Sequence, residues 1–159
     1  QLRRRDFCET VAGILAESGL PAELLELEIT ESAVMENPQE AVEILQRIGR
    51  MGVTLAIDDF GTGYSSLAYL KLFPIDHLKI DRSFVADIET DLNDRAIAFG
   101  TIALAHSLGL NVIAEGVETE DQLELLRTNG CDEVQGYLFS KPLNGAAAFA
   151  FLHARDAAE

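Results

Sequence analysis

A short apolar run, a loop rich in acidic residues and glycine, and an amphipathic helix recur along this chain, and this repetition limits the possible folds more than any other feature. The five apolar runs lie at residues 24–30, 53–59, 77–81, 111–117 and 133–139. Nearly continuous hydrophobicity over such short runs is typical of strands that are covered on both faces, as in a parallel sheet. The alternation of strand and helix therefore predicts an α/β fold.

The segments between the apolar runs have the periodicity and the end signals of helices. Asn37 followed by Pro38 predicts a capped helix start, and Thr119 with Gln122 predicts a capping box. A further helix is expected over residues 91–108.

The first and last predicted helices each carry an apolar stripe that we expect to face a core. The final helix spans residues 146–154, with Phe149 and Leu152 turned inward. The stripe of the first helix consists of Phe7, Val11, Ile14 and Leu15.

Two architectures are compatible with repeated strand–helix units: an open, doubly wound sheet and a (β/α)8 barrel. No Gly-x-Gly-x-x-Gly motif follows a strand, which disfavours a dinucleotide-binding sheet. Polar residues follow several strands, as at the active-site rim of a barrel. Five units cannot close eight strands, so either strands are missing or the sheet is open.

The charge of the chain restricts its partners. It contains 27 Asp and Glu against 12 Lys and Arg, a formal net charge of −15. Such a chain repels DNA and anionic membranes, and the sequence offers no segment expected to insert into a membrane. Cys8 and Cys131 are far apart and fit inert thiols in a reducing, cytoplasmic compartment. An anionic substrate would require a local cation.

The polar residues at the predicted strand ends are mainly carboxylates. In parallel strands these ends share one rim, so the carboxylates would be desolvated and would repel one another unless a cation lay among them. Oxygen ligands favour Mg²⁺ or Mn²⁺, and metal-assisted hydrolysis of a phosphate ester fits this set. The residues are Glu26, Glu28, Asp58, Asp59, Lys79, Asp81, Glu115, Glu118 and Gln135.

Other interpretations apply to these residues one at a time. A single acid after a strand is most often a helix cap, and Lys79 could form a structural ion pair with Asp81. Lys79 could also be the nucleophile of a Schiff-base aldolase, although nearby acids would raise its pKa. An interaction-only barrel is a further alternative. Four successive strand ends with an acid favour a metal site.

Five motifs of the chain, taken in order, resemble the EAL domain. The resemblance implies a TIM-like (β/α)8 barrel of the EAL type, here incomplete with about five βα units, and hydrolysis of cyclic di-GMP to linear pGpG. The motifs are Leu-Glu-Ile-Thr-Glu-Ser (27–32), Asp-Asp-Phe-Gly-Thr-Gly-Tyr-Ser-Ser-Leu (58–67), Leu-Lys-Ile-Asp-Arg-Ser-Phe-Val (78–85), Ala-Glu-Gly-Val-Glu-Thr (114–119) and Gln-Gly-Tyr-Leu-Phe-Ser-Lys-Pro-Leu (135–143).

The same resemblance implies roles for individual residues. Lys79 would contact the catalytic water, and Asp81 would support Lys79. Glu118 and Gln135 would be supporting or substrate-binding residues. The metal ligands would be Glu28, Asp58, Asp59 and Glu115, with two Mg²⁺ or Mn²⁺ ions in the complete domain, and Lys79, Glu115 and Asp59 would be catalytic.

A loop of the family links the active site to a homodimer interface, and the resemblance places it here as well. Glu31 would anchor this loop. The loop residues would be Phe60, Gly61, Thr62, Gly63, Tyr64 and Ser65.

The resemblance starts partway into the family's domain. We therefore expect residues 1–159 to be an N-terminally truncated EAL domain that lacks the Glu-Ala-Leu segment and a later Asn, which both supply metal ligands. An upstream sensory or diguanylate-cyclase domain is the expected neighbour. Because these ligands are missing, a catalytically inactive cyclic di-GMP-binding module is the main alternative function.

Overall fold

The computed structural model describes residues 2, 4, 6–63 and 67–156, which form an α/β unit around one parallel sheet. The sheet has the strand order β1-β2-β3-β4-β5, and each neighbouring pair is parallel. The strands are β1 (Glu26–Thr30), β2 (Thr54–Phe60), β3 (His77–Ile80), β4 (Asn111–Glu115) and β5 (Glu133–Gln135).

The strand order decides between the two predicted architectures. A doubly wound sheet reverses direction at a switch point, whereas here each strand lies next to the one that precedes it in sequence. Sequential parallel order is the order of a barrel. Within the described residues no strand pairs with the outer edge of β1 or of β5, so the five strands form an open arc. The predicted incomplete barrel is confirmed.

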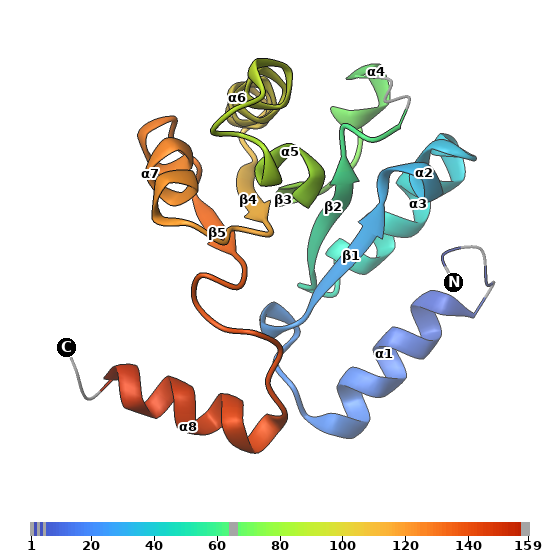
Figure 1. Ribbon diagram of the computed structural model, residues 1–159. Helices are drawn as coiled ribbons and strands as arrows, with labels where there is room; N and C mark the ends of the chain where they lie inside the picture. The colour runs from blue at the N-terminus through green and yellow to red at the C-terminus, as the bar shows by residue number, and fades with distance from the viewer. Residues whose placement is uncertain (1, 3, 5, 64–66, 157–159) are drawn as a thin grey trace.

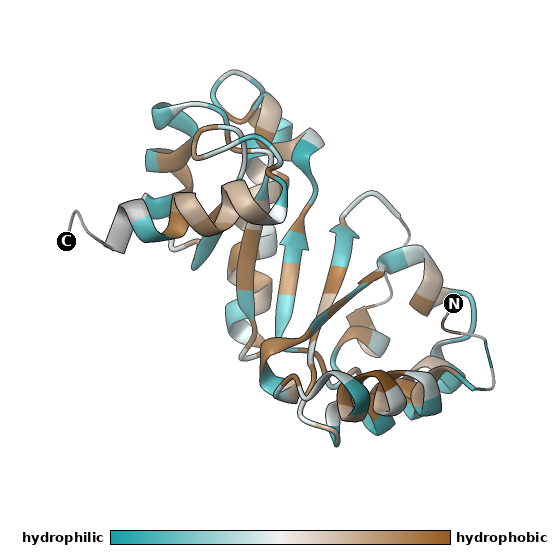
Figure 2. Ribbon diagram, turned by 90° about the horizontal axis from the view of Figure 1, so that it is seen from below, coloured by the Kyte–Doolittle hydropathy of each residue, from teal (hydrophilic) through white to brown (hydrophobic). Residues whose placement is uncertain are grey.

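Figure 1 shows helices along the convex side of this arc, with the first and last helices extending from its open side. Figure 2 shows apolar stretches in the strands and hydrophilic residues towards several arrowheads. The helices are α1 (Phe7–Ser18), the short 3-10 helix Ala22–Leu24, α2 (Glu31–Met35), α3 (Pro38–Gly49), α4 (Leu67–Leu70), α5 (Arg82–Ala86), α6 (Leu92–Ser107), α7 (Glu120–Thr128) and α8 (Gly145–Asp156).

The core lies between the central strands and the helices behind them. Leu55 and Ile57 of β2 and Leu78 and Ile80 of β3 are completely or almost completely buried. Ala56, on the opposite face of β2, is also buried. The central strands are thus covered on both faces, as their continuous hydrophobicity predicts. No helix among the described residues is long and apolar enough to span a membrane.

The predicted helix starts are found, with one difference in detail. The capping box of Thr119 and Gln122 is present at α7. Pro38 occupies the first turn of α3, but the side chain of Asn37 makes no capping hydrogen bond to the backbone. Its amide donates to Glu40 Oε2 at 2.8 Å instead, because this carboxylate is within reach one turn along.

The two predicted apolar stripes are only partly buried. Val11 of α1 is buried, but Ile14 is 58% exposed. The inward placement of Phe149 and Leu152 on α8 is wrong, because these side chains are 66% and 61% exposed. The reason is positional: α8 follows the edge strand β5 and extends away from the arc (Figure 1).

Both cysteines are free thiols, and their surroundings predict low reactivity. Cys8 is buried, and burial raises the pKa of Cys131 to about 11. At pH 8 the thiolate fraction of Cys131 is then about 0.1%. We expect iodoacetamide to alkylate the native chain at least about 100-fold more slowly than the urea-unfolded chain. Equal rates in a mass-spectrometric time course would contradict this prediction.

Candidate functional site

Lys79 lies at the centre of the predicted acidic cluster. Its side chain is almost fully buried, and its Nζ lies 2.5 Å from Glu28 Oε1, 2.5 Å from Glu115 Oε1 and 3.3 Å from Asp58 Oδ1. These four residues come from β3, β1, β4 and β2. The structure therefore brings together residues up to 87 positions apart, counted as 115 minus 28. The shared rim predicted from the strand ends is present.

The carboxylates determine the charge state of Lys79. Burial alone lowers the pKa of a lysine, but the hydrogen bonds to Glu115 and Glu28 outweigh it and hold the pKa of Lys79 above its ordinary value. A Schiff-base nucleophile requires a neutral amine. The aldolase interpretation is therefore disfavoured.

Asp58 and Asp59 lie at an irregularity in the sheet. The register between β2 and β3 shifts between Ile57 and Phe60, so two residues of β2 lie opposite one residue of β3. Asp59 has a left-handed backbone with a φ of 55°. Burial, followed by the charges of Asp58 and Asp81, raises the pKa of Asp59. This irregularity is a β-bulge, and it changes the direction of the chain at Asp58 and Asp59, where both side chains reach the rim.

Asp81 occupies a different position from the one predicted. It lies just past β3 and caps α5, where its Oδ1 accepts the backbone N–H of Ser83 at 3.0 Å. Within the described part of the chain, the ion-pair partners of Lys79 are Glu28, Asp58 and Glu115, and Asp81 is not among them. Asp81 faces Asp59 instead, since the two carboxyl groups perturb each other's pKa.

The cluster fits a hard divalent cation in its chemistry. Its acids offer only oxygen ligands, and Asp58 Oδ1 is buried without a hydrogen-bond partner among the described residues, since its 3.3 Å contact with Lys79 lacks hydrogen-bond geometry. Those same residues contain no group of three metal-ligating side chains already gathered around one point. The ammonium of Lys79 explains this, because it lies at the position where the carboxylates converge.

Glu31 anchors the beginning of the predicted loop. Its side chain is 1% exposed, and its Oε2 accepts the backbone N–H of Gly61 at 3.0 Å. Phe60 is buried in the core, and Thr62 Oγ1 donates to the carbonyl oxygen of Asp59 at 2.8 Å. The predicted loop residues Tyr64 and Ser65 lie outside the described residues.

The contact between Glu31 and the loop predicts an effect of Gly63→Ala. A Cβ at Gly63 would lie 2.8 Å from Glu31 Oε1, and moving this buried carboxylate would disturb the hydrogen bond that its Oε2 accepts from Gly61 N–H. We expect a loss of about 1–2 kcal/mol in the free energy of unfolding. Gly13→Ala is the control, because a Cβ there meets no atom within 4 Å. Urea unfolding that showed no difference between the two variants would contradict the prediction.

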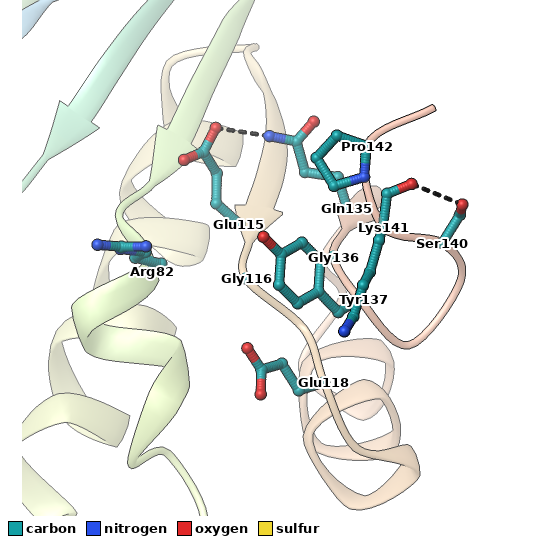
Figure 3. A pocket seen from close by; sticks show the side chains of 10 residues that line it. All are labelled: Arg82, Glu115, Gly116, Glu118, Gln135, Gly136, Tyr137, Ser140, Lys141 and Pro142. Atoms are coloured by element: carbon teal, nitrogen blue, oxygen red, sulfur yellow. Dashed lines mark hydrogen bonds between the residues drawn. The ribbon is translucent and has the colours of Figure 1, made fainter. Parts of the chain in front are cut away.

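Gln135 and Glu118 complete the predicted rim beside a pocket that the sequence did not reveal. Gln135 Nε2 donates to Glu115 Oε1 at 2.6 Å, and Glu118 is exposed. Figure 3 shows this pocket at the ends of β3, β4 and β5. The lining residues absent from the predicted site are Arg82, Gly116, Gly136, Tyr137, Ser140, Lys141 and Pro142. All seven lie inside the motifs at residues 78–85, 114–119 and 135–143, which is the signal the sequence offered.

The strand order and the rim cluster define an α/β barrel-type domain with an acidic centre at the carboxyl ends of its strands. Comparison with known families identifies it further. A family model described as the EAL domain matches residues 1–142. The chain therefore belongs to the EAL domain family.

Individual relatives agree with this assignment. The chain is 52% identical to the cyclic di-GMP phosphodiesterase NbdA of Pseudomonas aeruginosa over 153 residues, which are 96% of this chain and 20% of that protein. The solved phosphodiesterase PaMucR in complex with c-di-GMP is 41% identical, with a TM-score of 0.90 over 92% of this chain and 60% of that one. The manganese/cy-diGMP complex of Klebsiella pneumoniae BlrP1 is 34% identical, with a TM-score of 0.80 over 88% and 36%.

Proposed function

We propose that this chain carries part of the catalytic centre of a phosphodiesterase that hydrolyses cyclic di-GMP to linear pGpG. The observation that carries the proposal is the convergence of Glu28, Asp58 and Glu115, from three strands, on buried Lys79. The names of NbdA and of the PaMucR complex support the same substrate. Because the chain spans about a fifth of the length of the curated relatives it matches, the activity is proposed for the domain to which it contributes.

The proposed reaction is hydrolysis of one phosphodiester of the ring. The oxygen of water forms a bond to phosphorus, the bond from phosphorus to the 3′ oxygen breaks, and a proton passes from the water to that leaving oxygen. The product is the linear dinucleotide with a 5′ phosphate. In this chain Lys79 is well placed to hold the water by donating a hydrogen bond to its oxygen, since the ammonium is buried and remains charged.

Glu28, Asp58 and Glu115 would hold one divalent ion, with Asp59 at a second. The bound ions would supply positive charge for the phosphate oxygens and a lowered pKa for water. The manganese complex of the Klebsiella relative supports a divalent ion, and we propose Mg²⁺ or Mn²⁺. Gln135 would orient Glu115 through their 2.6 Å hydrogen bond. Asp81 would limit the position of Asp59 from the start of α5.

Asp58→Asn tests the proposed metal role with a readout that does not depend on turnover. Removing the charge of Asp58 should weaken Mn²⁺ binding at least about tenfold, measured by titration calorimetry. Asp94→Asn, on the outer helix α6, removes the same charge and should leave the affinity unchanged. Equal Mn²⁺ affinities of the two variants would overturn the assignment of Asp58.

Product analysis tests the function itself. The chain and a form extended upstream should be incubated with cyclic di-GMP and either Mg²⁺ or Mn²⁺, with pGpG followed by chromatography. Formation of pGpG supports the proposal. Tight binding without pGpG by the extended form would instead support the inactive nucleotide receptor.

We also propose that the domain is an incomplete portion of a longer protein with an upstream signalling domain and that it forms a homodimer near the loop after β2. The unpaired outer edges of β1 and β5 in the described residues support the first point. Leu67 and Leu72, which follow the loop, are 55% and 51% exposed and support the second. Sedimentation of Leu67→Asp should then show monomers where the unchanged protein shows dimers.

A further inference from the structure

A second pair of polar side chains joins β1 to β3 below the acidic centre. Glu26 lies two residues before Glu28 on β1, so these two side chains share one face of the sheet. His77 lies two residues before Lys79 on β3 and shares that face in the same way. His77 Nδ1 contacts Glu26 Oε2, just as Lys79 Nζ contacts Glu28 Oε1 one step higher. Glu26, one of the predicted rim residues, therefore lies below the rim.

The register of the strands does not by itself produce these two contacts. Both β1 and β3 pair with β2, which lies between them. Ala56 of β2 is in register with Glu28 on one side and with His77 on the other, so Glu28 and His77 are at the same height in the sheet. The contacts nevertheless run diagonally, because Glu28 contacts Lys79, two residues beyond His77. His77 is thus level with one glutamate and contacts the other.

Ala56 provides the space in which side chains of β1 and β3 can meet. It is fully buried, and it shares the face of Asp58, two residues further along β2. The backbones of two strands that flank a third are about 10 Å apart. A glutamate and a histidine side chain together span that separation when the residue between them carries only a methyl group. Glu28 and His77 are therefore within reach of each other.

The imidazole of His77 can donate a hydrogen bond to either glutamate of β1. Its side chain is 16% exposed, and a donor so largely removed from water is unfavourable without an acceptor. In the structure Glu26 is that acceptor. Without Glu26, His77 would turn to the other acid within reach, which is Glu28. That contact would draw the carboxylate of Glu28 away from Lys79 and from the acidic centre.

We infer that Glu26 is a positioning residue for the acidic centre, because it accepts the hydrogen bond of His77 and so keeps His77 away from Glu28. Glu28 then stays beside Lys79 and remains available to the proposed divalent ion. The inference rests on the proposed function, since Glu28 is a proposed metal ligand. Glu26 and His77 act through Glu28 and are not themselves assigned to the metal or to the substrate.

A double-mutant cycle tests the inference without any hydrolysis. In Glu26→Ala, His77 should pair with Glu28, and titration calorimetry should show Mn²⁺ binding weakened roughly tenfold. In the double variant Glu26→Ala/His77→Leu the affinity should return to within about twofold of the unchanged chain, because no donor then competes for Glu28. Glu26→Gln should also keep its affinity, since the amide oxygen still accepts a hydrogen bond from His77.

The ammonium signal of Lys79 in ¹H–¹⁵N NMR spectra of the metal-free chain gives a second readout that needs no bound ion. It should shift in Glu26→Ala, where Glu28 leaves Lys79, and return towards its original position in the double variant. His106→Leu is the matched control. It breaks another contact between a histidine and a carboxylate, the 2.8 Å contact with Asp132 Oδ2 at the end of α6, and should change neither readout.

Two results would overturn the inference. One is a Lys79 signal in Glu26→Ala that is identical to that of the unchanged chain. The other is a double variant as strongly altered as Glu26→Ala, because the effect would then come from lost packing and not from His77. If the cycle behaves as expected while the extended domain releases no pGpG, the proposed hydrolysis fails and the positioning role stands. If pGpG forms and the Lys79 signal does not respond to Glu26→Ala, the positioning role alone fails.

Discussion

Lys79→Met is expected to abolish most of the proposed hydrolysis and to destabilise the metal-free chain by about 3 kcal/mol. Methionine retains much of the length and the apolar stem of lysine but removes the ammonium. Glu28, Asp58 and Glu115 would then face one another without the cation that now lies within 3.3 Å of each. The estimate is at the lower end for a broken buried ion pair because Glu28 is 47% exposed and partly screened by water.

The same change should increase the dependence of stability on divalent metal. A bound ion stabilises the native state, and once the free ion concentration exceeds the dissociation constant this stabilisation grows with the logarithm of that concentration. In Lys79→Met, only a bound metal ion can offset the repulsion among the three carboxylates. Added Mg²⁺ should therefore restore part of the lost stability. The rate of pGpG formation should remain at least about 100-fold below that of the unchanged domain, because the group that holds the water is absent.

Lys71→Met is the matched control for Lys79→Met. It changes the net charge by the same amount, but Lys71 is exposed and outside the cluster. Its urea midpoint and its response to Mg²⁺ should equal those of the unchanged chain. The central role of Lys79 would be contradicted if both lysine variants unfolded at the same urea concentration and responded equally to Mg²⁺.

The strands and their shared rim could be predicted because both follow from local sequence patterns. Continuous apolar runs predicted strands buried on two faces, and Thr119 with Gln122 predicted the start of α7, where the capping box is present. The carboxyl ends of parallel strands meet at one edge whatever the register, so an acid after each strand was enough to place the cluster.

The partners of Lys79 could not be predicted in the same way, because they depend on register between strands. The sequence offered an ion pair with Asp81, two residues away, as one interpretation of Lys79, whereas Lys79 contacts Glu28, Asp58 and Glu115 across the sheet. The bulge at Asp58 and Asp59 is likewise a property of strand pairing.

Periodicity also failed for α8, for a related reason. A helical stripe shows which residues share a face but not whether another element covers it, so Phe149 and Leu152 are exposed despite their spacing.

Gly136→Ala is expected to cost roughly 3 kcal/mol or more in the free energy of unfolding, although it adds a single methyl group. That methyl carbon would lie 2.1 Å from the carbonyl oxygen and 2.4 Å from the nitrogen of Val117. Both contacts are with backbone, so no side-chain rotation relieves them. The chain must move apart at the point where Val117 N–H donates to Gln135 O at 3.1 Å and Leu138 N–H donates to Val117 O at 3.0 Å.

Moving the backbone of Gly136 away from Val117 would also disturb the site. This variant should therefore lose ligand affinity as well as stability, unlike a change that only destabilises the chain. Gln135 would shift away from Glu115 and Tyr137 away from the pocket at the strand ends, so the affinity for cyclic di-GMP should fall even in buffer without urea, where the chain remains folded. Gly100→Ala is the control: a Cβ there meets no atom within 4 Å in helix α6, and alanine should stabilise the chain by up to about 1 kcal/mol. Should Gly136→Ala unfold at the same urea concentration as Gly100→Ala, the close approach of Gly136 to the backbone of Val117, just past the ends of β5 and β4, would be wrong.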